Sequence, residues 1–170
     1  MSRRVKHEVL VGIPTYRRPE SLARCLASLV AQTEQGFDLF INFDATQAEC
    51  LNDRGRFWLD VLKRGREVIL RETRHEGQVA AHNHTLWVVG YHHPFIFRLD
   101  DDIILAPSAL AKALEYIQGH KQVGAVGGLW FDSRAGHRRQ LSEAEYQAGQ
   151  SLQAIDRHIQ AGYPPAGRHD

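Results

Sequence analysis

The chain has 170 residues, which is enough to bury one substantial hydrophobic core and too few for two comfortable domains. Its 43% hydrophobic and 24% charged residues are typical of a globular protein, and 21 Lys and Arg nearly balance 20 Asp and Glu. This balance argues against a nucleic-acid partner, which favours a basic surplus, and against acidic disorder.

Strands and helices alternate along the chain. Short β-rich apolar runs bounded by turn residues predict strands, and apolar residues at helical spacing predict helices. The expected strands are 8–13, 37–43, 67–72, 94–99 and a glycine-broken strand at 123–131. The expected helices are 18–33, 48–65, 77–90, 107–120 and a weakly amphipathic helix at about 142–160.

This alternation predicts an α/β fold, a Rossmann-like and mostly parallel sheet with helices on both faces. Residues 1–131 are expected to form this domain, and 132–170 a polar, partly helical segment. Ligands of such sheets bind beyond the carboxyl ends of the strands, near a switch in strand order. The residues that directly follow each strand are therefore the candidates for a site.

The sequence predicts neither a targeting segment nor a membrane span. The N-terminal apolar run is shorter than the core of a signal peptide, and no run approaches the roughly 20 apolar residues of a transmembrane helix. Cys25 and Cys50 lie in different predicted helices without metal-type spacing, which is typical of buried thiols in a reducing compartment. We therefore expect a cytoplasmic protein.

Three consecutive aspartates, Asp100, Asp101 and Asp102, directly follow the fourth predicted strand. Each carboxylate pair about 4 Å apart costs roughly 1 kcal/mol in water and about 4 at an effective dielectric near 20. An extended backbone would send Asp100 and Asp102 to one side and Asp101 to the other. Two such carboxylates suit Mg²⁺ or Mn²⁺ completed by substrate phosphates. The alternative is a solvated loop with a helix-capping aspartate.

Polar and aromatic side chains follow the other strands. Asp44, after the second strand, could accept hydrogen bonds from a base or ribose, or could bond its own backbone as a turn residue. Tyr16 could stack on a base while Arg17 and Arg18 meet phosphate, or the arginines could be solvated at a helix start. Gly77 opens a predicted helix, where backbone N–H groups can approach a ligand.

Five stretches together resemble the family-2 nucleotide-sugar glycosyltransferases of GT-A fold. They occur in the family's order and spacing and cover roughly residues 8–130: VGIPTYRRPESLARCLASLVAQT, FDLFINFDAT, RHEGQVAAHNHTL, FRLDDDIILAPSAL and VGAVGGLW. The resemblance implies transfer of a sugar from a nucleotide-diphosphate sugar to an acceptor hydroxyl. It further implies dependence on Mn²⁺ or Mg²⁺, inversion at the sugar and, as the expected base, uridine.

The resemblance also assigns site residues. It implies that the base is held by Pro14, Thr15, Tyr16, Arg17 and Asp44. It places Glu76, Gly77 and Gln78 near the nucleotide, and Asn83 where it helps to shape the site. Among the aspartates, it implies that Asp102 contacts the metal and that Asp100 and Asp101 reach the ribose or the metal.

The chain departs from the family pattern at three points. Phe43-Asp44 stands where an acidic pair is usual, and His82 stands where a basic residue usually precedes the asparagine. The family's second half, with its carboxylate general base, has no counterpart here, so the fold is expected to be incomplete at its C-terminus and the base to lie beyond residue 170. A non-catalytic nucleotide-sugar-binding module, or an inactive fragment, is therefore the alternative reading.

Overall fold

The computed structural model describes residues 7–128, and the structural statements below concern these residues. The expected helix at about 142–160 and the expected segment 132–170 lie outside the described residues. None of the described helices is both long and apolar enough to cross a membrane.

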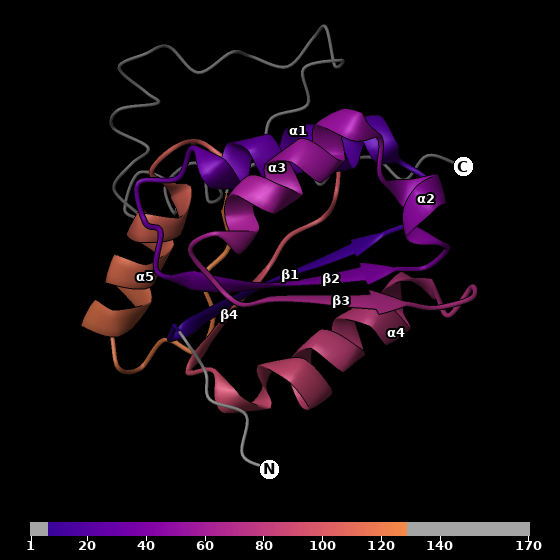
Figure 1. The fold of residues 1–170 in the computed structure, drawn as a ribbon. Helices are drawn as coiled ribbons and strands as arrows, with labels where there is room; N and C mark the ends of the chain where they lie inside the picture. The colour runs from indigo at the N-terminus through magenta and orange to yellow at the C-terminus, as the bar shows by residue number, and fades with distance from the viewer. Residues whose placement is uncertain (1–6, 129–170) are drawn as a thin grey trace, which may run out of the picture. The chain divides into compact units, whose positions relative to one another are not determined.

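A parallel four-stranded sheet with the order β3-β2-β1-β4 forms the centre of the fold (Figure 1). Its strands are β1 (Val9–Thr15), β2 (Phe37–Phe43), β3 (Val68–Glu72) and β4 (Phe95–Arg98). The chain adds β2 and β3 on one side of β1 and then returns to add β4 on the other. The predicted α/β fold is confirmed, and the strand order reverses between β1 and β4.

Helices cover both faces of this sheet, as the sequence predicts. α1 (Pro19–Val30) and α3 (Asp53–Lys63) pack on one face, and α4 (Gly77–His84) packs on the other (Figure 1). Pro19 in the first turn of α1 fits the position where a missing N–H costs nothing. α5 (Ala109–Gly119) follows the aspartates and lies beside the sheet.

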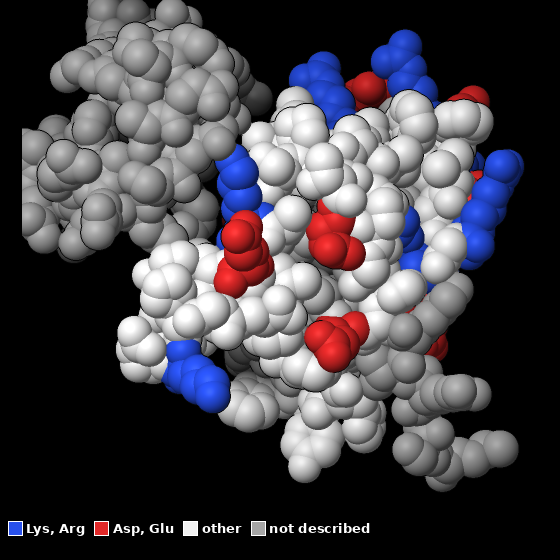
Figure 2. Space-filling model, turned by 90° about the vertical axis from the view of Figure 1, so that its left-hand side faces the viewer, with Lys and Arg blue, Asp and Glu red and all other residues white. Residues whose placement is uncertain are grey.

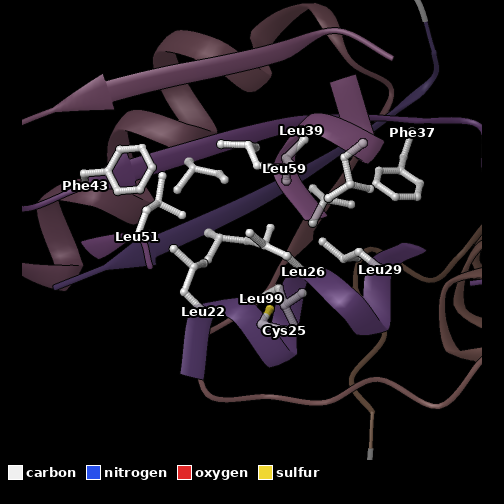
Figure 3. Packing of buried hydrophobic residues seen from close by; sticks show 14 of the residues in the cluster. Leu22, Cys25, Leu26, Leu29, Phe37, Leu39, Phe43, Leu51, Leu59 and Leu99 are labelled. Atoms are coloured by element: carbon white, nitrogen blue, oxygen red, sulfur yellow. The ribbon is translucent and has the colours of Figure 1, made fainter. Parts of the chain in front are cut away.

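The main core lies between the sheet and the helices α1 and α3. Leu22, Leu26 and Leu29 of α1 recur at helical spacing and point toward Leu39 and Phe43 of β2 (Figure 3). Burying each such side chain stabilises the fold by about 1.5–3 kcal/mol. The buried thiols expected from the sequence also lie here: Cys25 and Cys50 are both buried and free. Burial raises the pKa of each thiol, so both stay protonated.

The predicted helix 48–65 is wrong in one respect, because it is two helices. α2 (Gln47–Cys50) ends before Leu51, and α3 begins after Asn52. Asn52 is extended, and its side-chain oxygen accepts a hydrogen bond from the Gly55 N–H at 2.8 Å. Such an N-cap satisfies an otherwise unpaired amide and starts a new helix.

The predicted helix 77–90 also changes form along its length. α4 is regular only to His84, after which Thr85–Val89 form a π-helical turn (η1) and Gly90–His92 a 3₁₀ turn (η2). The buried Thr85 hydroxyl donates to the Ala81 carbonyl oxygen at 2.9 Å, which competes with the regular backbone ladder. The π-helical turn begins at this residue, and the Gly90 N–H donates to the Thr85 carbonyl oxygen.

The expected strand at 123–131 does not form in the part that is described. Residues 123–128 have no regular secondary structure, and 129–131 lie outside the described residues. Among the described residues, nothing lies within 4 Å of a Cβ built on Gly124, Gly127 or Gly128. Glycine weakens a strand because it adds entropy to the unfolded chain and packs nothing.

Candidate functional site

A cleft of about 380 Å³ opens at the carboxyl ends of β1, β2 and β4, where the strand order reverses. This is the position at which open α/β sheets bind ligands. The cleft is lined by Pro14, Thr15, Tyr16, Arg18, Asp44, Gly77, Gln78, Ala81, Asp100, Asp101 and Asp102. The topology therefore brings together side chains that are far apart in the sequence, such as Thr15 and Asp101, which are 86 residues apart.

A larger hollow of about 550 Å³ lies at the opposite end of the strands, between the start of β1 and Pro94. Figure 2 shows the molecule from the end at which the strands begin, where side chains of both charges are scattered among uncharged ones. We assign the site to the smaller cleft, because the strand-end carboxylates and the reversal of strand order meet there.

The three aspartates occupy two different environments. Asp101 is buried, 5% exposed, and accepts a hydrogen bond from the Thr15 hydroxyl at 2.7 Å. The side chains of Asp100 and Asp102 are about half exposed and line the cleft. This division follows the alternation expected from the sequence, although residues 101–102 form a turn.

Cations and neutral donors offset the repulsion between these carboxylates. The Arg18 guanidinium lies 3.4 Å from Asp101 Oδ1 and 3.1 Å from Asp102 Oδ2. On the other side, the Gln78 amide donates to Asp100 Oδ1 at 3.0 Å. Burial raises the pKa of Asp101, and the Thr15 hydrogen bond and the Arg18 charge oppose this only in part.

Asp44 fastens the loop after β3 to the end of β2. Its Oδ1 accepts hydrogen bonds from the Thr73 hydroxyl at 2.7 Å and the Glu76 N–H at 2.8 Å, and its Oδ2 accepts one from the Gly77 N–H at 2.8 Å. Burial raises the pKa of Asp44, but these hydrogen bonds outweigh it, and the pKa is lowered overall. The loop that opens α4 is thus held against the cleft.

An aromatic pair connects this loop to the end of β1. The rings of Tyr16 and His75 are 4.9 Å apart, and the Tyr16 hydroxyl lies 3.3 Å from His75 Nε2. His75 (φ 55°) and Arg17 (φ 49°) both adopt the left-handed backbone region. This conformation costs about 1–2 kcal/mol in a residue with a side chain, and such strain concentrates at functional sites.

Three residues assigned by the resemblance do not line the cleft. The guanidinium of Arg17 turns away and pairs with Glu49 at 2.7 Å, while Glu76 pairs with Arg71 at 2.9 Å. Asn83 is exposed on α4. The remaining assigned residues line the cleft together: Pro14, Thr15, Tyr16, Asp44, Gly77, Gln78, Asp100, Asp101 and Asp102.

The assignment by resemblance missed Arg18 and Ala81, which line the cleft. The sequence contained a signal for Arg18, because both arginines of PTYRR were candidates for phosphate contact. Arg17 adopts a left-handed backbone conformation and pairs with Glu49, whereas Arg18 lines the cleft, and composition and periodicity do not show this difference.

The donor set fits a divalent cation that a substrate helps to bind. Residues 7–128 contain no group of three or more His, Cys, Asp or Glu side chains arranged to hold a metal ion. Asp100 and Asp102 nevertheless present two half-exposed carboxylates to the cleft. Mg²⁺ is usually bound through one or two carboxylates and substrate phosphates, so this pair suits a metal–diphosphate clamp.

Comparison with known families agrees with the fold. The sequence profile of glycosyl transferase family 2 matches residues 10–167. The chain belongs to this family. The amylovoran biosynthesis glycosyltransferase AmsE of Erwinia amylovora is 27% identical to it over 132 residues, which are 76% of this chain and 48% of AmsE. The family-2 chain thus spans about half the length of this curated relative.

Solved glycosyltransferases share the architecture of this family-2 chain. TarS of S. aureus (residues 1–349) superposes with a TM-score of 0.54 at 19% identity, over 67% of this chain and 33% of that one. The mannosyltransferase PcManGT of Pyrobaculum calidifontis gives 0.52 at 19% identity, over 65% of this chain and 32% of that one. TarS has been crystallised with UDP, and PcManGT with GDP-Man and Mn²⁺. At this identity the likeness shows the GT-A type fold.

Proposed function

We propose that the cleft binds a nucleotide-diphosphate sugar and that the protein transfers the sugar to an acceptor hydroxyl. The observation that carries this proposal is that Asp100 and Asp102 line the same cleft as Tyr16 and Gly77. Carboxylates suit a metal–diphosphate group, and an aromatic face suits a base. Membership in glycosyl transferase family 2 supports the reaction class.

Each end of the donor would meet different chemistry. Asp100 and Asp102 would hold Mn²⁺ or Mg²⁺, which when bound neutralises charge on a departing diphosphate. Arg18, beside Asp102, offers a guanidinium to a phosphate oxygen. At the other end, Tyr16 is 38% exposed, and its ring would stack on the base.

The free acceptor site of Asp44 favours a nucleobase that carries a ring N–H group. A carboxylate has about four lone-pair sites, and the loop residues described above use three of them. The remaining site on Oδ2 can accept the N3–H of uracil or the N1–H of guanine. We propose a uridine donor, as the resemblance implies, and use guanosine as the comparison because PcManGT was solved with GDP-Man.

Binding without turnover is the second candidate function. The described carboxylates that line the cleft are those of Asp44 and of the aspartate cluster, and all of them have binding or structural roles above. An inverting displacement also needs a general base to deprotonate the acceptor hydroxyl. The inverting course, the base and the cytoplasmic location stay predictions from the sequence.

The test is calorimetric titration of UDP into the protein with Mn²⁺ and again with EDTA. We expect binding with Mn²⁺, and its loss with EDTA and in Asp102→Asn. The matched control is Asp60→Asn, which removes an exposed surface carboxylate on α3. Binding of UDP that survives both EDTA and Asp102→Asn would overturn the metal–diphosphate assignment. GDP is titrated in the same way, and a protein that binds GDP but not UDP would overturn the proposal of a uridine donor.

A second measurement separates transfer from binding. Release of UDP from UDP-glucose or UDP-N-acetylglucosamine, with water as a slow acceptor, reports turnover. Metal-dependent release that Asp102→Asn abolishes supports a transferase. Tight metal-dependent binding with no release from any donor tested, including GDP-mannose, would support the non-catalytic module.

A further inference from the structure

His82 connects the sheet to the aspartate cluster. It lies in α4, is only 6% exposed, and stands between Arg98 at the end of β4 and Asp100 two residues later. The Arg98 Nε–H donates to His82 Nδ1 at 3.3 Å. The opposite ring nitrogen, Nε2, lies 3.4 Å from Asp100 Oδ1.

This arrangement defines the tautomer of the imidazole. An arginine Nε carries its hydrogen at every accessible pH, so the nitrogen that faces it must accept. Nδ1 of His82 therefore presents its lone pair to Arg98, and the ring hydrogen of the neutral imidazole lies on Nε2. That hydrogen faces the Asp100 carboxylate.

Two polar side chains lie next to the same oxygen of Asp100, but only Gln78 makes a hydrogen bond to it, and His82 lies at ion-pair distance. The Gln78 amide and the His82 ring each approach Oδ1 from α4. No hydrogen bond or ion pair to Asp100 Oδ2 is found within residues 7–128. The Gln78 hydrogen bond and the nearby His82 ring restrain the carboxylate through Oδ1 and leave the other oxygen for a ligand in the cleft.

We propose that His82 is a positioning residue, which Arg98 holds in its Nε2–H tautomer so that it orients Asp100 toward the metal–diphosphate group. The ligand in this inference rests on the proposed function, whereas the tautomer does not. Residues that orient a metal-binding side chain typically change affinity 10–100-fold when they are removed. Replacing a buried histidine that has only a structural role would change the stability of the protein and leave this affinity unaltered.

The first test is nitrogen NMR of the ligand-free protein labelled with ¹⁵N-histidine. We expect His82 to show the Nε2–H tautomer in the wild type. In Arg98→Met, which removes the donor to Nδ1, we expect a mixture of tautomers. An Nδ1–H tautomer in the wild type, or no change in Arg98→Met, would overturn the proposal whether or not the protein binds a nucleotide.

The second test is the affinity for UDP with Mn²⁺ in variants whose fold is verified by circular dichroism. We expect His82→Leu, which lacks a donor, to weaken binding about 10–100-fold. His82→Gln, whose amide can reach Asp100, should stay within about 3-fold of wild type. The control is His84→Leu, because His84 stacks on Phe40 instead of contacting the aspartates, and it should not alter affinity.

Two outcomes separate the proposals. Wild-type affinity in His82→Leu, or equal losses in the Gln and Leu variants, would overturn the role of His82. A wild type that binds neither UDP nor GDP would overturn the proposed function. The NMR measurement of the tautomer would then be the test of whether Arg98 orients His82. If His82→Leu does not fold, His82→Asn replaces it, because its shorter amide cannot reach Asp100.

Discussion

At the residue scale, Asp44 illustrates how one carboxylate at a strand end can hold a distant loop in place. The sequence left open a turn aspartate and a base contact, and the structure shows an acceptor for one hydroxyl and two backbone amides of a distant loop. Hydrogen bonds to a charged acceptor are worth about 1.5–3 kcal/mol each, so these three hydrogen bonds contribute substantially to the stability of the fold.

We therefore expect Asp44→Asn to destabilise the protein by about 2–3 kcal/mol. The NH2 group of asparagine cannot accept a hydrogen bond, so whichever way the side chain is turned, either the Thr73 hydroxyl or the Gly77 N–H loses its acceptor. Urea denaturation measures the difference. The control Asp60→Asn, at an exposed site, should change stability by less than about 0.5 kcal/mol. An equal loss of stability in both variants would contradict a stabilising role for the hydrogen bonds of Asp44.

The lowered pKa of Asp44 makes its contribution depend on pH. The unfolded carboxyl titrates near its ordinary value of 3.8, and the folded one at a lower value. The stabilisation is therefore complete above pH 3.8 and is lost as the pH falls through the folded pKa. The stability difference between wild type and Asp44→Asn should shrink below about pH 4, and a difference that stays constant to pH 2 would contradict this assignment.

At the element scale, a close approach between β1 and η1 fixes the position of the helix that lines the cleft. A Cβ built on Gly12 would overlap the Thr85 methyl group, and Thr85 is fully buried. Glycine is needed here for space, which is a different reason from the positive φ of 84° that Gly77 adopts.

Gly12→Ala should therefore destabilise the protein by about 1–3 kcal/mol, because the added methyl group overpacks the interface. Thr85→Ser removes the opposing methyl group, so the double variant should recover part of this loss. Thermal denaturation of the two single variants and the double variant measures the coupling. Gly119→Ala, where a Cβ meets nothing within 4 Å, is the matched control; additive losses would contradict the contact.

The break between α2 and α3 depends on one cap. Replacing Asn52 by Ala removes the acceptor for the Gly55 N–H and should cost about 1 kcal/mol. Asn52→Ser keeps a capping oxygen and should lose less than half as much. Denaturant titration compares the two variants, and equal losses would instead indicate the side-chain hydrogen bond from Asn52 to Glu20, at 2.7 Å, as the main contribution.

At the scale of the whole molecule, the strand order places the cleft between segments that are far apart in the chain. A ligand that spans the ends of β1, β2 and β4 would connect them, and binding to the folded state alone stabilises it. At about 100 times its dissociation constant, UDP with Mn²⁺ should add roughly 2.7 kcal/mol. This corresponds to a rise in Tm of about 5–10 °C for a chain of this size.

Scanning calorimetry with and without EDTA measures this shift. Chelation should return the Tm to that of the free protein, and Asp102→Asn should show no shift with UDP and Mn²⁺. A shift that UDP produces equally well in EDTA would mean that the nucleotide is bound without a metal, and would count against the role of the aspartates.

The sequence by itself determined the alternation of strands and helices and the positions of Asp44 and the aspartate cluster at the strand ends. These features depend on short-range periodicity and on strand boundaries, which a chain shows residue by residue. The sequence did not predict the break before α3, and it wrongly predicted a strand at residues 123–128. In these places an N-cap and several glycines outweigh the apolar pattern.

Only the tertiary structure decided how the side chains in the cleft are paired. Thr15 and Asp101 are 86 residues apart, and Asp44 and Gly77 are 33 apart, so no local pattern connects them. Their contacts follow from the strand order β3-β2-β1-β4, which brings the carboxyl ends of distant strands to one edge. The local sequence indicates which polar residues follow the strands, and the topology determines which of them face the cleft.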